Sequence, residues 1–145
     1  MRLELFMMFN GNCRQAVEFY ARVFRSSVEH LITYSKMPGW ENYTGPESDK
    51  DLIMYSRILF ENLVLMCSDV PSKMEIVKGN NLSPTVSLDD KEEITRIFNE
   101  LKIGGKVLME LQQTFYSECY GYVEDQFGIQ WQILHYQIQP PRDEH

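Results

Sequence analysis

The stretch that decides the fold is residues 125–134, which read D-Q-F-G-I-Q-W-Q-I-L. Gly128 can reverse the chain here, because glycine adopts a positive φ at no steric cost. The residues after the turn alternate in character, as in a strand with two different faces. One face should carry Gln130, Gln132 and Leu134, and the other should carry Trp131, Ile133 and His135. Residues 119–124 supply the partner strand. The sequence therefore predicts a final hairpin with an apolar face for a core and an amide-bearing face that can line a pocket.

Composition restricts the class of partner. The chain has 145 residues, of which 43% are hydrophobic, so it can bury a core without disulfides as one domain or as two small modules. It carries 14 Lys and Arg against 21 Asp and Glu, a formal net charge of −7. Nucleic acids and anionic membranes bind clustered basic residues, so the acidic balance argues against both as main partners. The charge balance does not argue for or against a small-molecule ligand.

Three scattered cysteines predict a reducing environment. Cys13, Cys67 and Cys119 form no C-x-x-C pair, which is typical of free thiols in a cytoplasmic protein. The apolar run in residues 1–9 is too short for a signal-peptide core, and no small-residue cleavage site follows it. No stretch approaches the roughly 20 apolar residues of a membrane span. We therefore expect a cytoplasmic location.

The first half of the chain predicts one helix and four strands. Residues 3–9 are apolar and fit a strand buried on both faces. Asn12 can cap a helix over residues 13–24, where apolar residues recur at steps of three and four. Strands are expected at 28–34, 52–60 and 63–68. The loop at 35–50 carries Trp40 and Tyr43, which either fold over a pocket or form a surface cluster of their own.

The second half repeats this order. A strand is expected at 82–88, and Asp89 or Asp90 can cap the next helix, which ends before Gly104 and Gly105. Three more strands follow at 106–111, 119–124 and 130–136. The tail at 137–145, with two prolines and several charges, is expected to be disordered.

This order predicts an α+β fold. The pattern is strand–helix–strand–strand–strand, twice, within one domain over residues 1–145: a first module of about 1–70 and a second of about 80–136. Each module leaves an open sheet edge, so the modules should pair, within one chain or between two. The helices should cover one face of each mixed sheet, and the other faces should curve around a cleft.

Several segments together resemble one family. They are F-N-G-N-C-R-Q-A-V-E-F-Y (9–20), L-M-C-S-D (65–69), G-N-N-L-S (79–83) and L-Q-Q-T-F-Y (111–116), followed by D-Q-F-G (125–128) and Trp131. This combination resembles the PhnB-like proteins of the glyoxalase/bleomycin-resistance/dioxygenase, or vicinal oxygen chelate, superfamily. The resemblance covers about residues 3–136. It implies paired β-α-β-β-β modules and a homodimer.

The resemblance also implies where a metal would bind. Superfamily enzymes hold a divalent ion with His and Glu side chains from four strands, with open positions for substrate oxygens. The corresponding positions here fall near Leu5, Leu65, Ser83 and Gln132. Two of these have no donor atom and two are poor neutral ligands. The histidine that many relatives carry after a methionine is replaced by Tyr55. We therefore predict no metal and no cofactor, unless the register is shifted by one residue.

The other chemically active side chains are isolated in sequence. His30 and His135 have no second metal ligand at a matching spacing, which favours surface histidines. Cys13 sits at a helix start, where a thiolate is favoured, but neither it nor Cys67 has a neighbouring histidine to act as a base. A packing role is expected for both cysteines.

The predicted cleft is neutral and aromatic. Its expected ligand-binding residues come from the strands and one loop: Tyr55, Arg57, Gln130 and Gln132 pointing inward, Leu5 and Met7 at the base, and Phe115 and Tyr116 nearby. Arg57 either attracts a carboxylate or phosphate or pairs with Glu61 or Glu110. The aromatic rings either stack on a flat ligand or fill core and interface.

These observations favour a metal-free, homodimeric protein that binds a small molecule. A metal-dependent lyase, isomerase or dioxygenase is the alternative, and a purely structural partner protein is a third possibility. No residue pattern identifies a reaction, and fold analogy alone does not supply one. Whether the protein is an enzyme therefore stays open at the level of sequence.

Overall fold

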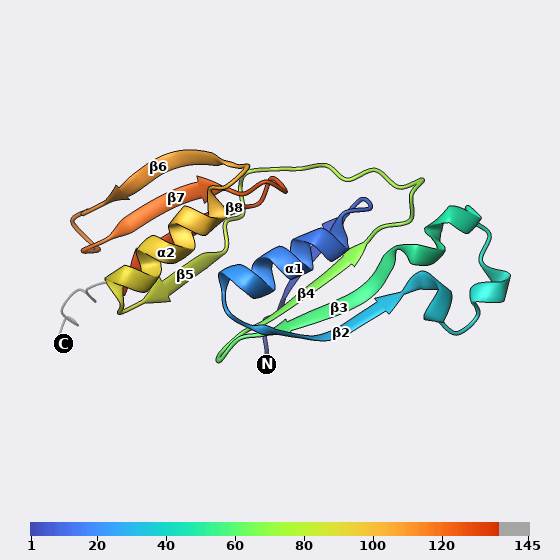
Figure 1. Cartoon of the computed structure of the whole chain (residues 1–145). Helices are drawn as coiled ribbons and strands as arrows, with labels where there is room; N and C mark the ends of the chain where they lie inside the picture. Colours follow the sequence, from blue (N-terminus) through green and yellow to red (C-terminus); the bar gives the residue numbers. More distant parts are fainter. Residues whose placement is uncertain (137–145) are drawn as a thin grey trace. The chain divides into compact units, whose positions relative to one another are not determined.

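The fold was analysed in a computed structural model, which describes residues 1–136 (Figure 1). The expected disorder of the tail at 137–145 lies outside the described residues. The chain forms two compact units, one over residues 1–77 and one from Lys78 onward. Each unit is described by itself. None of the helices within residues 1–136 has the length and apolar character needed to cross a membrane.

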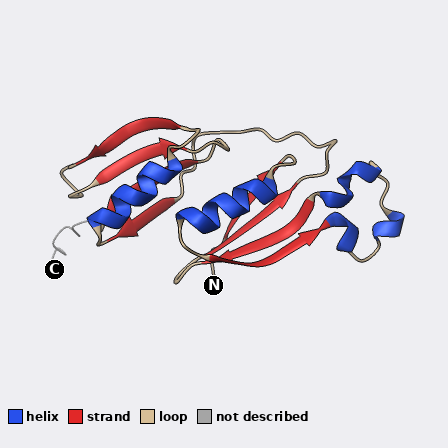
Figure 2. Ribbon diagram, in the orientation of Figure 1, coloured by secondary structure: helices blue, strands red, loops and turns tan. Residues whose placement is uncertain are grey.

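Unit 1 is a four-stranded mixed sheet with one helix. Its elements are β1 (Leu5–Phe9), α1 (Cys13–Val23), β2 (Ser27–Thr33), β3 (Ile53–Leu59) and β4 (Val64–Asp69). The strand order is β1-β4-β3-β2, with β1 and β4 parallel and the other pairs antiparallel. The helix α1 lies along one face of this sheet (Figure 1). Three short 3₁₀ turns connect β2 to β3 (Figure 2): Tyr34–Lys36, Trp40–Asn42 and Glu47–Asp51.

Unit 2 repeats this architecture. Its elements are β5 (Thr85–Leu88), α2 (Lys91–Leu101), β6 (Lys106–Gln112), β7 (Tyr120–Glu124) and β8 (Gln130–His135). The strand order is β5-β8-β7-β6, with β5 and β8 parallel, so each strand has a counterpart in unit 1. The predicted α+β class and the twofold β-α-β-β-β order are confirmed.

The first strand differs from its prediction. β1 is buried on one face only: Met7 and Phe9 are 6% and 4% exposed, whereas Phe6 and Met8 are 44% and 58% exposed. Within unit 1, α1 covers a single face of the sheet, and alternate side chains of a strand point to opposite faces. A continuous apolar run therefore supplies both the core of unit 1 and an uncovered apolar surface on the other face.

The final hairpin forms as predicted. Gly128 has a φ of +85°, and Trp131 and Ile133 are buried, whereas Gln130 and Gln132, which alternate with them, are only partly buried. The buried Asp125 carboxylate organises the turn. It accepts hydrogen bonds from the backbone N–H of Phe127 (2.8 Å) and Ile129 (3.0 Å) and from Trp131 Nε1 (2.8 Å). One carboxylate thus fixes the turn and the first core residue after it.

The two helices are capped differently. Asp90, one of the two predicted candidates, caps α2 by accepting from the backbone N–H of Glu92 (3.0 Å) and Glu93 (3.2 Å). Asn12 stands at the N-cap of α1, but its side chain makes no capping hydrogen bond, so that prediction is wrong. A residue distant in sequence takes this role.

That residue is Asp69, at the end of β4. Its Oδ1 accepts from the backbone N–H of Gly11 (2.8 Å) and Cys13 (3.0 Å), and its Oδ2 accepts from Ile53 N–H (2.9 Å). Its backbone carbonyl accepts from the Tyr34 hydroxyl (2.9 Å). A carboxylate at a helix N-terminus also interacts favourably with the helix dipole. The buried Asp69 therefore joins the start of α1 to the start of β3.

We expect Asp69→Asn to lower the free energy of unfolding by about 2 kcal/mol, because an amide nitrogen cannot accept the backbone N–H bonds that a carboxylate oxygen accepts. Urea unfolding followed by circular dichroism measures the change. Asp51→Asn is the control, because Asp51 is exposed and its substitution should stay within about 0.5 kcal/mol. Equal stability of the two variants would contradict the role given to Asp69.

The loop between β2 and β3 contains a surface aromatic cluster. The Trp40 ring stacks on Tyr43 at a centroid distance of 4.7 Å, and Tyr34 meets Tyr43 edge-on at 6.1 Å. The Tyr43 hydroxyl donates to Asp49 Oδ2 at 2.5 Å, and the backbone N–H of Ser72 donates to the same oxygen at 3.3 Å. Of the two alternatives for Trp40 and Tyr43, these contacts favour a cluster within the loop itself.

The Tyr43–Asp49 hydrogen bond should appear in the alkaline unfolding profile. This bond is the main cause that raises the pKa of Tyr43 to about 12, because the phenol donates only while protonated. Its stabilising effect is therefore present below the ordinary tyrosine pKa of 10.0 and is lost as pH rises towards about 12. We expect the stability difference between the wild type and Tyr43→Phe to shrink over this range. Urea unfolding midpoints of both proteins, measured between pH 10 and pH 12, give this stability difference. A difference that stayed constant would contradict a role for the Tyr43–Asp49 hydrogen bond.

Candidate functional site

The uncovered face of the unit 2 sheet carries a polar network. On the covered face, a Cβ added to Gly121 would lie 2.7 Å from the Phe98 side chain of α2, so Gly121 and its cross-strand partner Ile133 point towards the helix. Their neighbours along β7 and β8 point the other way. We call these the unit 2 face: Tyr120, Tyr122, Glu124, Gln130 and Gln132.

Hydrogen bonds fix these side chains in two groups. The Tyr120 hydroxyl donates to Gln132 Oε1 at 2.7 Å. The Tyr122 hydroxyl donates to Gln130 Oε1, and Gln130 Nε2 donates to Glu124 Oε1 at 3.2 Å. Burial, followed by the nearby Tyr116 and Tyr122, raises the pKa of Tyr120, so its hydroxyl keeps its proton and remains a donor. The face is thus preorganised by side chains that hold one another in place.

The predicted residues of this unit fall on or beside the unit 2 face. Gln130 and Gln132 belong to it. Tyr116 lies in the loop before β7, and its ring is 5.8 Å from that of Tyr120. Phe115 meets Tyr116 edge-on at 5.0 Å and is 96% exposed. An aromatic chain therefore leads from solvent to the edge of the network.

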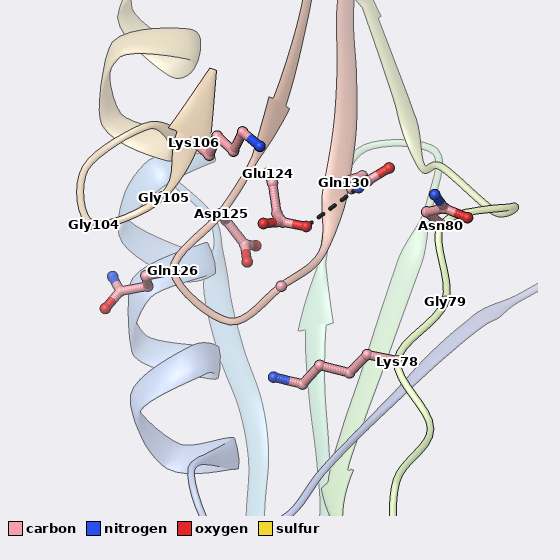
Figure 3. Close-up of a pocket in the computed structure, with 11 residues that line it drawn as sticks. Lys78, Gly79, Asn80, Gly104, Gly105, Lys106, Glu124, Asp125, Gln126 and Gln130 are labelled. Carbon is pink, nitrogen blue, oxygen red and sulfur yellow. Dashed lines mark hydrogen bonds between the residues drawn. The ribbon is translucent and has the colours of Figure 1, made fainter. Parts of the chain in front are cut away.

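The same face ends in a hollow at the β7–β8 turn. Its volume is about 730 Å³, and polar groups and glycines line it: Lys78, Gly79, Asn80, Gly104, Gly105, Lys106, Glu124, Asp125, Gln126, Gly128 and Gln130. Figure 3 shows Glu124 between Lys106 on one side and Lys78 on the other. Glu124 and Gln130 are shared with the unit 2 face, so the network continues into the hollow.

In unit 1, Tyr55 and Arg57 lie on the uncovered face. They alternate with Ser56 and Ile58, which are fully buried. Arg57 Nε lies 3.8 Å from Glu29 Oε2 on the adjacent strand, so within unit 1 the ionic partner is Glu29 and not Glu61. This nitrogen is buried and makes no hydrogen bond within residues 1–136. The His30 and Tyr55 rings are 6.3 Å apart on the same face.

Leu5 and Met7 lie on the opposite face from the one expected. Met7 pairs with Cys67 and Cys67 with Ser56, whose hydroxyl lies 3.9 Å from Cys13 Sγ on α1. Cross-strand partners share a face, so Met7 points towards α1. Leu5 is two residues away on the same strand and shares this direction. Both side chains belong to the helix-covered side of unit 1.

The side chains at the family's metal positions do not fit a divalent ion. Leu5 and Leu65 are register partners on the helix-covered face, and the residues one step along the strands are Phe6 and Met66, which add no hard donor. The Ser83 hydroxyl donates to the Gln130 carbonyl, and the Gln132 amide oxygen is engaged by Tyr120. Within residues 1–136, no three His, Cys, Asp or Glu side chains lie close enough together to hold a metal ion.

The two buried cysteines are poor nucleophiles. Desolvation, followed by the nearby Asp69 carboxylate, raises the pKa of Cys13 to about 12, which outweighs the benefit of a helix start. Burial also raises the pKa of Cys67. The thiolate is the reactive form, so both groups are inert near neutral pH. The structure favours the packing role expected for them.

Sequence reasoning missed the cations of the hollow. Lys78 and Lys106 carried no signal, because one lies in the segment joining the units and the other begins a strand far away in sequence. Two close approaches bring them to one hollow. A Cβ on Gly105, next to Lys106, would lie 2.0 Å from the Glu124 carbonyl oxygen, and a Cβ on Gly128 would lie 3.2 Å from Cδ of Lys78. The two glycines at 104–105 were the one sequence signal near this site, and from sequence they indicated only the end of a helix.

The fold places the chain in a known class. The glyoxylase/bleomycin resistance protein/dioxygenase domain from Frankia sp. EAN1pec superposes with a TM-score of 0.66 over 100% of this chain and 98% of that chain, at 8% identity. At this identity the likeness concerns the fold alone. The repeated β-α-β-β-β units therefore define a protein of the glyoxalase/bleomycin-resistance fold.

The family follows from closer matches. The family model described as 3-demethylubiquinone-9 3-methyltransferase matches residues 2–134. Protein YjdN of Escherichia coli K12 is 30% identical over 148 residues, which cover 97% of this chain and 99% of that protein. The structure of PA1353 from Pseudomonas aeruginosa is also 30% identical, with a TM-score of 0.79 over 94% of this chain and 99% of that one.

A further solved structure connects this family description with the name PhnB. The putative 3-demethylubiquinone-9 3-methyltransferase from Bacillus cereus, also described as PhnB protein, is 25% identical with a TM-score of 0.73, over 94% of this chain and all of that one. The chain belongs to this PhnB-like family, as the sequence motifs indicated.

Alkylation tests whether the buried cysteines can act as nucleophiles. At pH 8 we expect iodoacetamide to modify Cys119 first in the native protein, because Cys119 is only partly buried, and to leave Cys13 and Cys67 unmodified. In urea all three should react. Peptide mass spectrometry distinguishes the sites. Rapid native modification of Cys13 would restore it as a nucleophile candidate.

Proposed function

We propose that the protein binds a small molecule on the unit 2 face without a bound metal ion. The observation that carries this proposal is the hydrogen-bonded set of Tyr120, Gln132, Tyr122 and Gln130, which fills an uncovered sheet face with fixed polar groups. Ligand sites commonly combine apolar surface with a few placed hydrogen-bonding groups. The binding roles of Tyr55 and Arg57 on the uncovered face of unit 1 are still predictions, whereas Leu5 and Met7 point towards α1 and away from that face.

The free donors and acceptors define what the ligand offers. Gln132 Oε1 is engaged by Tyr120, whereas its Nε2 makes no hydrogen bond within residues 1–136 and is available to an acceptor on the ligand. The tyrosine hydroxyls donate to the glutamines, so their oxygens can accept. Tyr116 and Phe115 add ring surface on which a flat group can stack. A planar, uncharged molecule with a carbonyl group fits these features.

We also propose that the protein works as a homodimer. The uncovered face of unit 1 exposes Phe6 and Met8, and a second copy would bury such side chains. The outer strands β1 and β5 leave backbone groups unpaired within their own sheets, which favours further pairing. Light scattering coupled to size exclusion tests this. A monomer at micromolar concentration would contradict it.

Metal analysis combined with a thermal-shift screen tests the binding proposal. We expect no stoichiometric Zn, Mn, Fe or Ni after expression in metal-replete medium, and a rise in melting temperature with a planar carbonyl compound, because a ligand of the native state stabilises it. A tightly bound stoichiometric metal would instead favour the alternative, a metal-dependent lyase, isomerase or dioxygenase.

The unit 2 face predicts which variant loses binding. Tyr120→Phe removes the hydroxyl that orients Gln132, and we expect it to weaken binding of a compound found in the screen by about fivefold, the effect of one lost hydrogen bond. Tyr136→Phe is the matched control, because Tyr136 is exposed and its hydroxyl makes no hydrogen bond within residues 1–136. Isothermal titration measures both. Equal affinities would place the ligand elsewhere.

A further inference from the structure

The hollow at the β7–β8 turn has an unusual charge arrangement for an acidic protein. The whole chain carries a net charge of −7, yet two lysines line this one hollow. Neither Lys78 nor Lys106 forms an ion pair within the described part of the chain, although Lys106 is the cross-strand partner of Glu124. Figure 3 shows both side chains directed towards the hollow from opposite sides.

The carboxylates of the hollow are already engaged. Asp125 is buried, and its oxygens accept from two backbone N–H groups and from Trp131 Nε1. Glu124 Oε1 accepts from Gln130 Nε2, which the Tyr122 hydroxyl holds in place. Both carboxylates are thus held by other groups rather than by the two ammonium groups. The cationic charge of the lysines is therefore available to a ligand.

The backbone around the hollow keeps it open. Gly104 and Gly128 have positive φ values of +72° and +85°, and Gly105 approaches the Glu124 carbonyl too closely for a side chain. These glycines are explained by turn geometry and close approach. A consequence is that two segments, residues 104–105 and residue 128, reach the hollow without side chains that would fill it. Asn80 and Gln126 add amide groups at its rim.

We propose that this hollow is an oxyanion site, in which Lys78 and Lys106 bind a phosphate or carboxylate group of a small molecule and the neighbouring amides complete the hydrogen bonds. Ammonium groups bind such anions as point charges with several donors. The volume of about 730 Å³ admits a small molecule, and the net negative charge of the chain disfavours a polyanion. The site lies within unit 2 and goes beyond the planar-ligand function proposed above.

Selective labelling gives a test with internal controls. Four of the eight glycines line the hollow, namely Gly79, Gly104, Gly105 and Gly128, and four lie elsewhere, namely Gly11, Gly39, Gly45 and Gly121. We expect titration of ¹⁵N-glycine-labelled protein with inorganic phosphate, or separately with succinate, to shift the first set and leave the second set unchanged. Sodium chloride at equal ionic strength should not reproduce these shifts.

Charge variants identify the cations. Lys78→Gln/Lys106→Gln should weaken phosphate binding by about fivefold or more, the combined effect of two exposed ion pairs. Lys78→Arg/Lys106→Arg should retain binding, and Lys50→Gln, which removes an exposed lysine of unit 1, should change nothing. The glycine spectrum reports whether each variant is folded. Shifts spread over all eight glycines, equal shifts in chloride, or unchanged affinity in the folded glutamine variant would overturn the proposal.

Discussion

A buried carboxylate holds each unit together. In unit 1, Asp69 accepts three backbone hydrogen bonds and so fixes the start of α1 against the start of β3. In unit 2, Asp125 does the same for the final turn and for Trp131. A buried charge is costly unless it is hydrogen-bonded, so these bonds leave the surrounding backbone few alternatives. The uncovered faces depend on this, because strand ends fixed in this way set the direction of every side chain along the strand.

Local patterns predicted the elements well and long-range contacts poorly. The alternation at 130–135 and the helical repeat at 91–101 predict a strand and a helix without knowledge of the rest of the fold, because periodicity assigns each residue to a face. The cap of α1 could not be predicted from neighbouring residues, because the carboxylate that accepts Cys13 N–H is 56 positions away. The face of Leu5 and Met7 was likewise ambiguous in an apolar run, because such a run has no polar side to reveal its register.

In the candidate site, too, the features set by local sequence were predictable and those set by long-range contacts were not. Gln130 and Gln132 could be assigned to one face from sequence, and their hydrogen bonds to Tyr122 and Tyr120 agree with that assignment. The ionic partner of Arg57 and the lysines of the hollow depend on which strands lie side by side. The glyoxalase fold is thus retained here with two amides, two phenols and the single carboxylate of Glu124 on the unit 2 face, whereas a metal would need several imidazoles or carboxylates together.

The two tryptophans give each unit its own optical reporter. Trp40 is partly exposed and stacks on Tyr43 in unit 1, whereas Trp131 is buried in unit 2 with its indole N–H bonded to Asp125. Their different surroundings should give distinct emission spectra, red-shifted for the first and blue-shifted for the second. The chain contains only these two, so single Trp→Phe replacements would show by fluorescence whether the halves unfold as one cooperative block or in sequence.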